Sequence, residues 1–405
     1  MLATTFIVCL LLCGYVYGGY PVMLAIVARM RPRPVRHGAC LSGISVIIPA
    51  FNEEGCIEHK VRSTLANGYP EQLLEVIVAS DGSSDRTNEL VRRIRHPKLQ
   101  LLELPRQGKV AALNAAVREA RGEIIVFTDA DVDLDPGALS LLLRNFADPN
   151  VGGVTGRKAY RAEAGETTHA IARGEGLYVR FDEWQKHLES RIGSTISAHG
   201  ALHALRKELY IPMRDPTAAD DIAISVRVVL QGKRLIYEPD AIARVERPDR
   251  RSEFARKVRI ANQAMVALFG LKRALWTSGF YSLQLISHKL LRYFVPIFLI
   301  LMLITNALLA LGSPFWRVLL ALHAGFYAAA VAGFVLKGRR GAHRLLTVPL
   351  YFCTVNACAL VALLSVVRNQ RSATWAPGAG PASAATEASA RSRAPRPRSP
   401  TPAAA

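Results

Sequence analysis

The chain has 405 residues, of which 50% are hydrophobic and 20% are charged, and its formal net charge is +19. This composition excludes an intrinsically disordered protein and is too apolar for an ordinary soluble enzyme of this length. The basic residues do not form the aromatic-interleaved stripe that nucleic-acid binding requires, and several flank apolar runs, so we expect no nucleic-acid partner. The 6 cysteines are scattered without metal-ligand spacing, which argues against a disulfide framework and a zinc site.

Four uncharged, apolar runs are candidates for membrane spans: residues 1–28, 293–316, 318–336 and 345–367. At a rise of about 1.5 Å per residue, each can cross a hydrocarbon core of about 30 Å. The first run lacks the basic start of a signal peptide, so we expect an uncleaved anchor, and the other three form a C-terminal membrane region at 293–367. Residues 283–292 are expected to form an interfacial helix with Lys289 and Arg292 reaching toward the head groups.

Basic residues set the expected orientation of these spans. Arg29, Arg31, Arg33 and Arg36 follow the first run directly, which places residues 42–280 on the cytoplasmic side of the cell (inner or plasma) membrane. A fourth crossing would leave Arg368 outside, so the last segment is either re-entrant or overrules the charge bias. The tail, residues 372–405, is rich in Ala, Pro, Ser and Arg and is predicted to be disordered.

The central region alternates predicted strands with predicted helices. Strands are expected at residues 44–50, 74–79, 99–104 and 123–128, and helices at 88–94, 108–121 and 222–230. This alternation predicts an α/β domain with a mostly parallel sheet covered by helices on both faces. Ligands of such sheets bind beyond the carboxyl ends of the strands, which is where Asp81, Asp129 and Asp131 fall.

Two pairs of carboxylates are candidates for chemistry. Asp129 and Asp131 suit Mg²⁺ or Mn²⁺, which bind through one or two carboxylates together with substrate phosphates, although two solvated loop acids would look the same. Asp220 and Asp221 begin a predicted helix, where acids are favoured by the helix dipole. They would also be placed to remove a proton from an acceptor hydroxyl. The spacing alone does not separate these alternatives.

Five motifs occur together in one order: PAFNEE at 49–54, ASDGSSD at 79–85, GKVAALNAA at 108–116, FTDADV at 127–132 and ADD at 219–221. With them the chain resembles membrane-bound glycosyltransferase family 2, which includes cellulose-, chitin- and hyaluronan-synthase-like enzymes. The resemblance implies a Rossmann-like GT-A fold in the cytoplasm, flanked by transmembrane helices. It also implies inverting transfer from a nucleotide-diphospho-sugar, most often a UDP-sugar, to a growing polysaccharide or glycan acceptor at the membrane lipid surface.

The same resemblance implies roles for individual residues. Asp221 would be the catalytic base, Asp131 would bind Mg²⁺ or Mn²⁺, and His199 and Gly200 would meet the acceptor. The nucleotide-sugar site would comprise Pro49, Ala50, Asn52, Glu53, Asp81, Lys109, Asp129, Arg256 and Arg259. Lys109 is expected to meet the diphosphate, since a cation beside a helix N-terminus suits an anion.

One motif departs from the family. Processive members carry QxxRW near the membrane, but the corresponding stretch here is Arg256-Lys257-Val258-Arg259-Ile260, which keeps only the second arginine. The missing Trp removes a flat surface for stacking a sugar ring, so long-chain processivity is in doubt. The alternatives are transfer of a single sugar to a lipid carrier and, in another class, an inactive scaffold of a polysaccharide-assembly complex. A polysaccharide synthase would also imply export partners.

Overall fold

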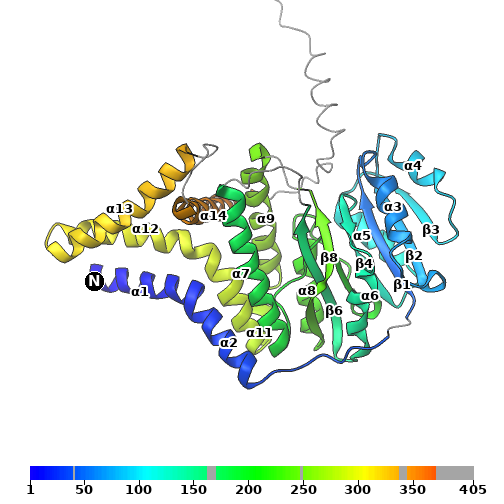
Figure 1. The fold of residues 1–405 in the computed structure, drawn as a ribbon, viewed down its shortest axis with the longest axis horizontal. Coiled ribbons are helices and arrows are strands. Elements are labelled where there is room, and N and C mark those ends of the chain that lie inside the picture. The colour runs from blue at the N-terminus through cyan, green and yellow to red at the C-terminus, as the bar shows by residue number, and fades with distance from the viewer. Residues whose placement is uncertain (40–41, 162–169, 247–249, 337–343, 371–405) are drawn as a thin grey trace, which may run out of the picture.

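The structure is a computed structural model that describes residues 1–39, 42–161, 170–246, 250–336 and 344–370. The predicted disordered tail, 372–405, lies outside these residues. Figure 1 shows two halves side by side: a sheet with flanking helices, and a group of long helices that includes the N-terminus. Helices α7 (Ala170–Ile192) and α9 (Arg250–Gly270) stand between the two halves.

One eight-stranded sheet organises the first half, in the order β3-β2-β1-β4-β7-β6-β8-β5. The strands are β1 (Ile44–Ala50), β2 (Leu74–Asp81), β3 (Leu99–Leu104), β4 (Ile124–Phe127), β5 (Val132–Leu134), β6 (Val151–Tyr160), β7 (His203–Arg206) and β8 (Arg234–Val245). Strands β1 to β4 pair in parallel, as predicted. Beyond β4 the sheet becomes mixed, because β7 runs antiparallel to both β4 and β6 and β5 runs antiparallel to β8.

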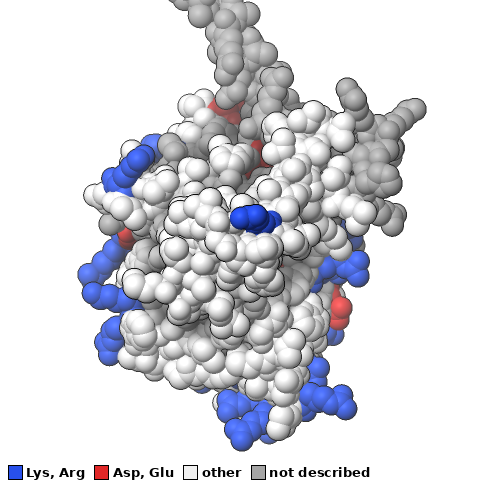
Figure 2. Space-filling view, turned by 90° about the vertical axis from the view of Figure 1, so that its left-hand side faces the viewer, with Lys and Arg blue, Asp and Glu red and all other residues white. Residues whose placement is uncertain are grey.

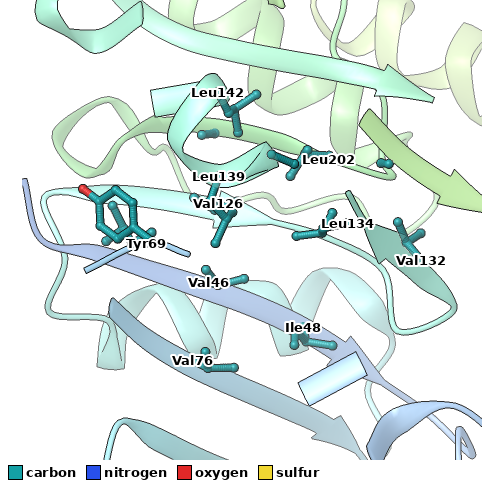
Figure 3. Close-up of a cluster of buried hydrophobic side chains, with 14 of the residues drawn as sticks. Val46, Ile48, Tyr69, Val76, Val126, Val132, Leu134, Leu139, Leu142 and Leu202 are labelled. Atoms are coloured by element: carbon teal, nitrogen blue, oxygen red, sulfur yellow. The ribbon is translucent and has the colours of Figure 1, made fainter. Parts of the chain in front are cut away.

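Helices connect these strands. They are α3 (Ile57–Leu65), α4 (Thr87–Arg93), α5 (Lys109–Glu119), α6 (Ala138–Leu143) and α8 (Asp220–Leu230), with short 3₁₀ turns at Glu71–Leu73, Arg144–Ala147 and Lys207–Leu209. All seven residues of β1 are buried, which is typical of a parallel strand covered on both faces. Val46 and Ile48 pack on one face with Leu139 and Leu142 of α6, and Ile47 packs on the other with α5. Figure 3 shows the first of these clusters, which includes Val126 of β4, the strand that precedes Asp129.

The second half contains four helical runs long and apolar enough to cross a membrane: Leu2–Met30, Phe280–Ala310, Pro314–Val335 and Leu345–Val367. They consist of α1 (Leu2–Gly14), a π-helical turn Tyr15–Gly19, α2 (Tyr20–Met30), α11 (Phe280–Gln284), a π-helical turn Leu285–Leu290, α12 (Leu291–Ala310), α13 (Pro314–Val335) and α14 (Arg344–Val367), preceded by α10 (Ala274–Thr277). Figure 2 looks onto this half, whose broad surface is largely uncharged and has basic residues around its edges. The chain therefore has the helices of a membrane protein.

The segment predicted as an interfacial helix, residues 283–292, is the first part of the continuous run Phe280–Ala310. Its Arg292 does not reach toward head groups. It is mostly buried and donates hydrogen bonds to the Tyr178 hydroxyl (3.1 Å) and to Asp182 (3.4 Å) on α7. The expectation failed because α7 places hydrogen-bond acceptors beside Arg292, and the sequence of residues 283–292 alone does not reveal this neighbour.

Candidate active site

Gly200 marks the point at which the predicted catalytic segments meet. A Cβ atom at Gly200 would lie 3.7 Å from Oδ2 of Asp129 and 3.9 Å from Oδ2 of Asp221. Asp129 follows β4, whereas Asp221 lies in the first turn of α8, so distant segments bring their carboxylates to one place. The absent side chain at Gly200 leaves room between these two carboxylates.

Lys109 connects the two aspartate pairs. Its Nζ lies 2.8 Å from Oδ1 of Asp129 and 3.0 Å from Oδ2 of Asp220. Burial alone would lower the pKa of Lys109, but these two carboxylates outweigh burial and raise it, so the side chain is a cation. Lys109, the first residue of α5, was expected to meet a diphosphate. In this structure it forms ion pairs with two carboxylates instead.

The adjacent acids Asp220 and Asp221 titrate in opposite directions. Burial and, next, the neighbouring charge of Asp220 raise the pKa of Asp221 to about 6. Burial acts on Asp220 too, but Lys109 pairs with it and holds its pKa below the ordinary value. Two neighbouring carboxyl groups with separated pKa values are the pattern expected where one acts as acid or base and the other supports it. Asp221 is therefore the better placed proton acceptor of the two.

Asp131 has the character of a cation ligand. Asp131 is exposed to solvent, and among the described residues it has no ion-pair partner. Desolvation by the surrounding protein and the charge of Asp129 raise its pKa, so a bound cation would relieve both. No group of three or more His, Cys, Asp or Glu able to hold a metal occurs among the described residues. The site thus fits an ion such as Mg²⁺ or Mn²⁺ that completes its coordination with substrate phosphates.

The predicted nucleotide-side residues lie in two neighbouring loops. Pro49 and Ala50 end the buried strand β1. Asn52 has a left-handed backbone (φ 55°), and its Oδ1 accepts a hydrogen bond from the Ser84 amide at 2.8 Å. Glu53 is buried, and its amide donates to Thr87 Oγ1 at 2.8 Å. These bonds join the loop after β1 to the loop after β2.

Asp81 is only 1% exposed and already has several partners. It accepts hydrogen bonds from the amides of Gln107 (2.7 Å) and Gly108 (2.9 Å) and pairs with the Arg106 guanidinium, which lies over the Phe51 ring. Asp81 therefore orders the loop that leads into α5 and Lys109. The role expected from the sequence, direct contact with the nucleotide, stays a prediction.

A cavity of about 360 Å³ opens beside Asp221 and extends toward the long helices. His199, predicted to meet the acceptor, lines it, and its Nε2 lies 2.8 Å from Nζ of Lys186. Burial and Lys186 hold the pKa of His199 far below its usual range, so the neutral ring accepts this hydrogen bond. Arg256 also lines the cavity, whereas Arg259 is not among the lining residues.

Sequence reasoning did not identify Lys60 on α3 as part of this region. Its side chain is buried, and Nζ donates to Thr128 Oγ1 (2.8 Å) and to the Val132 carbonyl (2.6 Å). These two acceptors flank the Asp129–Asp131 loop in the sequence, so the hydrogen bonds of Lys60 hold both ends of the loop. Burial lowers the pKa of Lys60 to about 7. A single lysine in an amphipathic helix carries no sequence signal of such a role.

Residues 45–210 match the family model described as "Glycosyl transferase family 2". The chain carries a family 2 glycosyltransferase domain. The family predicted from the five motifs is thereby confirmed for the domain at residues 45–210, which is a glycosyltransferase domain. Curated relatives agree: poly-beta-1,6-N-acetyl-D-glucosamine synthase of Staphylococcus aureus strain MSSA476 is 28% identical over 211 residues, covering 50% of this chain and 49% of the relative. The enzyme of the same description from Staphylococcus epidermidis is 27% identical over 213 residues. The chain thus spans about half the length of the curated relatives it matches.

A solved structure resembles the glycosyltransferase over most of its length. It is the mannosyltransferase PcManGT from Pyrobaculum calidifontis, in complex with GDP-Man and Mn²⁺. The likeness has a TM-score of 0.71 at 25% identity and covers 91% of this chain and 100% of that chain. The fold class predicted from the sequence is confirmed. A divalent cation and a nucleotide-sugar are present in this neighbour, which agrees with the chemistry of the carboxylates described above.

Proposed function

We propose that this glycosyltransferase moves a sugar from a nucleotide-diphospho-sugar to an acceptor hydroxyl in the cavity beside Asp221, with inversion at the anomeric carbon. The observation that carries the proposal is the convergence of Asp129 and Asp221 on the space beside Gly200. Asp129 belongs to the end of the sheet where a nucleotide binds in related folds. Asp221 belongs to the cavity that receives the acceptor. The reacting bond would thus lie between the two carboxylates.

The residues divide the reaction between them. Asp221 takes the proton of the acceptor hydroxyl as its oxygen attacks the anomeric carbon, and the bond to the diphosphate breaks on the opposite side. A Mg²⁺ or Mn²⁺ ion held by Asp131 would offset the charge of the leaving diphosphate. Lys109 keeps Asp220 ionised, and the charge of Asp220 in turn raises the proton affinity of Asp221. The loops at Asn52 and Asp81 are the proposed place of the nucleotide.

The nature of the donor and acceptor is also part of the proposal. PcManGT was crystallised with GDP-Man, which supports a GDP-sugar as donor class. The sequence resemblance implies a UDP-sugar, which is the alternative donor class. Ile260 stands where processive relatives carry Trp, and it lines the cavity. Because an aliphatic side chain offers no flat face for a sugar ring, we propose transfer of one or a few sugars to a glycan or lipid-linked acceptor.

The test compares the two acids. Membranes containing the protein are incubated with radiolabelled UDP- and GDP-sugars, and the product is sized. With the active donor, Asp221→Asn should lower turnover by about 10² to 10⁴, because the amide cannot accept a proton. Donor affinity should stay nearly unchanged. Asp220→Asn is the matched variant and should be milder. An inactive Asp220→Asn beside an active Asp221→Asn would show that the wrong acid had been assigned.

A further inference from the structure

A second cavity, of about 260 Å³, adjoins the acceptor cavity among the long helices. Five residues line both cavities: Tyr17, Tyr178, Tyr351, Val355 and Asn356. The remaining lining residues of the second cavity are Leu177, Phe181, Val348 and Phe352. It thus has no charged lining residue, in contrast to the first cavity. The two cavities thus share a wall, and the first has charged lining residues, among them Asp221, that the second lacks.

Two candidate membrane spans and helix α7 line the apolar cavity. Tyr17 belongs to the run Leu2–Met30, and Val348, Phe352 and Val355 belong to the run Leu345–Val367, both of which are long and apolar enough to cross a membrane. Helix α7 contributes Leu177, Tyr178 and Phe181. Most of the exposed wall is apolar, so a polysaccharide, which carries hydroxyl groups along its whole length, would find few partners for them there. A hydrocarbon chain fits it.

Two cations that line the polar cavity form no salt bridge among the described residues. Arg256 and Lys289 both line it, and neither has a hydrogen-bond or ion-pair partner among the described residues. The Nε of Arg256 is in addition buried. Lys289 is close enough to Asp221 to lower its pKa. Arg256 and Lys289 thus keep hydrogen-bond donors for a ligand, and a phosphate suits both arginine and lysine.

From this arrangement we propose that the acceptor is a membrane phospholipid whose hydroxylated head group reaches Asp221, whose phosphate lies at Arg256 and Lys289, and whose hydrocarbon chain fills the cavity lined by Val355 and Phe352. The three parts follow from the lining residues: Asp221, Arg256 and Lys289 line the first cavity alone, Val355 lines both, and Phe352 lines the second alone. The inference rests on the proposed function, because it identifies Asp221 as the acceptor end. It makes Arg256, predicted from the sequence to bind the donor, a residue of the acceptor site.

Photo-crosslinking tests the lipid directly. The full-length protein is placed in phosphatidylcholine nanodiscs with a minor fraction of phosphatidylinositol that carries a diazirine in its acyl chain, and the labelled peptides are mapped. Label is expected in α7 around Phe181 and in α14 around Phe352. Val355→Phe, which narrows the junction of the cavities, should lower this label about tenfold, as expected when a chain loses a few buried methylenes. Val361→Phe, at an exposed site on the same helix, should not.

Two further comparisons separate the parts of the proposal. Arg256→Gln should reduce labelling by phosphatidylinositol without changing donor affinity, whereas equal labelling in this variant and the wild type would overturn the phosphate assignment. Equal labelling of Val355→Phe and Val361→Phe, or loss of the label on adding soluble N-acetylglucosamine oligosaccharides, would overturn the lipid proposal. Asp221→Asn should keep its label. If labelling of the variants follows the expected pattern but the wild type consumes no nucleotide-sugar, the proposed sugar transfer is wrong and the lipid site is supported.

Discussion

The pH dependence of sugar transfer is the sharpest test of the paired acids. The pKa of Asp221 is raised from its ordinary value of 3.8 to about 6. The difference corresponds to about 3 kcal/mol in the free energy of protonation. Asp221 must be ionised to take a proton, so turnover should rise with pH through 6 and reach a plateau above it. At pH 5, turnover should be about one tenth of the plateau.

The neighbouring acid provides the perturbation. Asp220→Asn removes a negative charge that raises the pKa of Asp221, and it frees Lys109 from one of its two carboxylates. Both changes favour the ionised form of Asp221, so the acid limb should move down by about one pH unit. At pH 5 this variant should then keep about half of its own plateau turnover. Asp240→Asn, at an exposed carboxylate paired with Arg144, is the control and should leave the limb in place.

The assay is turnover at saturating donor and acceptor, measured from pH 4.5 to pH 8 and normalised to each variant's plateau; these limits bracket the expected pKa of about 6. Donor affinity is measured over the same range, so that a loss of binding is not mistaken for a loss of base. Flat wild-type turnover across the acid limb would refute the assignment of Asp221 as base. An acid limb that stays in place in Asp220→Asn would refute the coupling of the two acids.

Three other predictions concern the metal, the loop beneath it and the orientation. Sugar transfer should cease in EDTA and return with Mg²⁺ or Mn²⁺, and full activity in the chelator would contradict the metal site. Asp131→Ala should weaken donor binding. Asp133→Ala, at a carboxylate paired with Arg161, should change donor binding little. Lys60→Met leaves two buried acceptors without a donor and should destabilise the fold by about 1–3 kcal/mol in thermal unfolding, unlike Lys272→Met at an exposed position. In intact cells, a membrane-impermeant thiol reagent should label Gly312→Cys, between α12 and α13, but not Arg93→Cys on α4. The opposite labelling would reverse the proposed orientation.

The elements that the sequence predicted best are those with continuous apolar patterns. Strands β1 and β3 have the bounds expected from their residues, and the last apolar helix spans Leu345–Val367 as expected. The antiparallel part of the sheet was not predicted. Strand β6 begins with two glycines within its first three residues, and β8 contains Pro239 and several charged residues. Their pairing depends on contacts across the sheet, which a local pattern does not carry.

In the candidate site, too, features set by a local sequence pattern could be predicted, whereas contacts between distant segments could not. The position of Asp129 and Asp131 after β4 follows from the end of an apolar run, and so could be predicted. The ion pairs of Lys109 with Asp129 and Asp220 could not, because they join three separate segments of the chain. Asp81 shows how a motif residue can have structural partners, since its carboxylate orders the loop before α5. A motif thus located the site, and the fold determined which charges meet there.

The long helices contribute to the candidate acceptor site as well as to membrane anchoring. Glu189 on α7 is fully buried, and its carboxylate accepts a hydrogen bond from the Tyr20 hydroxyl (2.6 Å) and lies 2.7 Å from His288 Nδ1. A buried charge of this kind is tolerated only when its hydrogen bonds are complete, so α2, α7 and the run Phe280–Ala310 are held in one arrangement. The same helical runs place Tyr17 and Arg292 on the wall of the cavity that contains Asp221. The sheet domain supplies the carboxylates, but much of the cavity wall beside Asp221 is built by the helices. If this cavity binds the acceptor as proposed, the choice of acceptor depends on the helical half of the molecule.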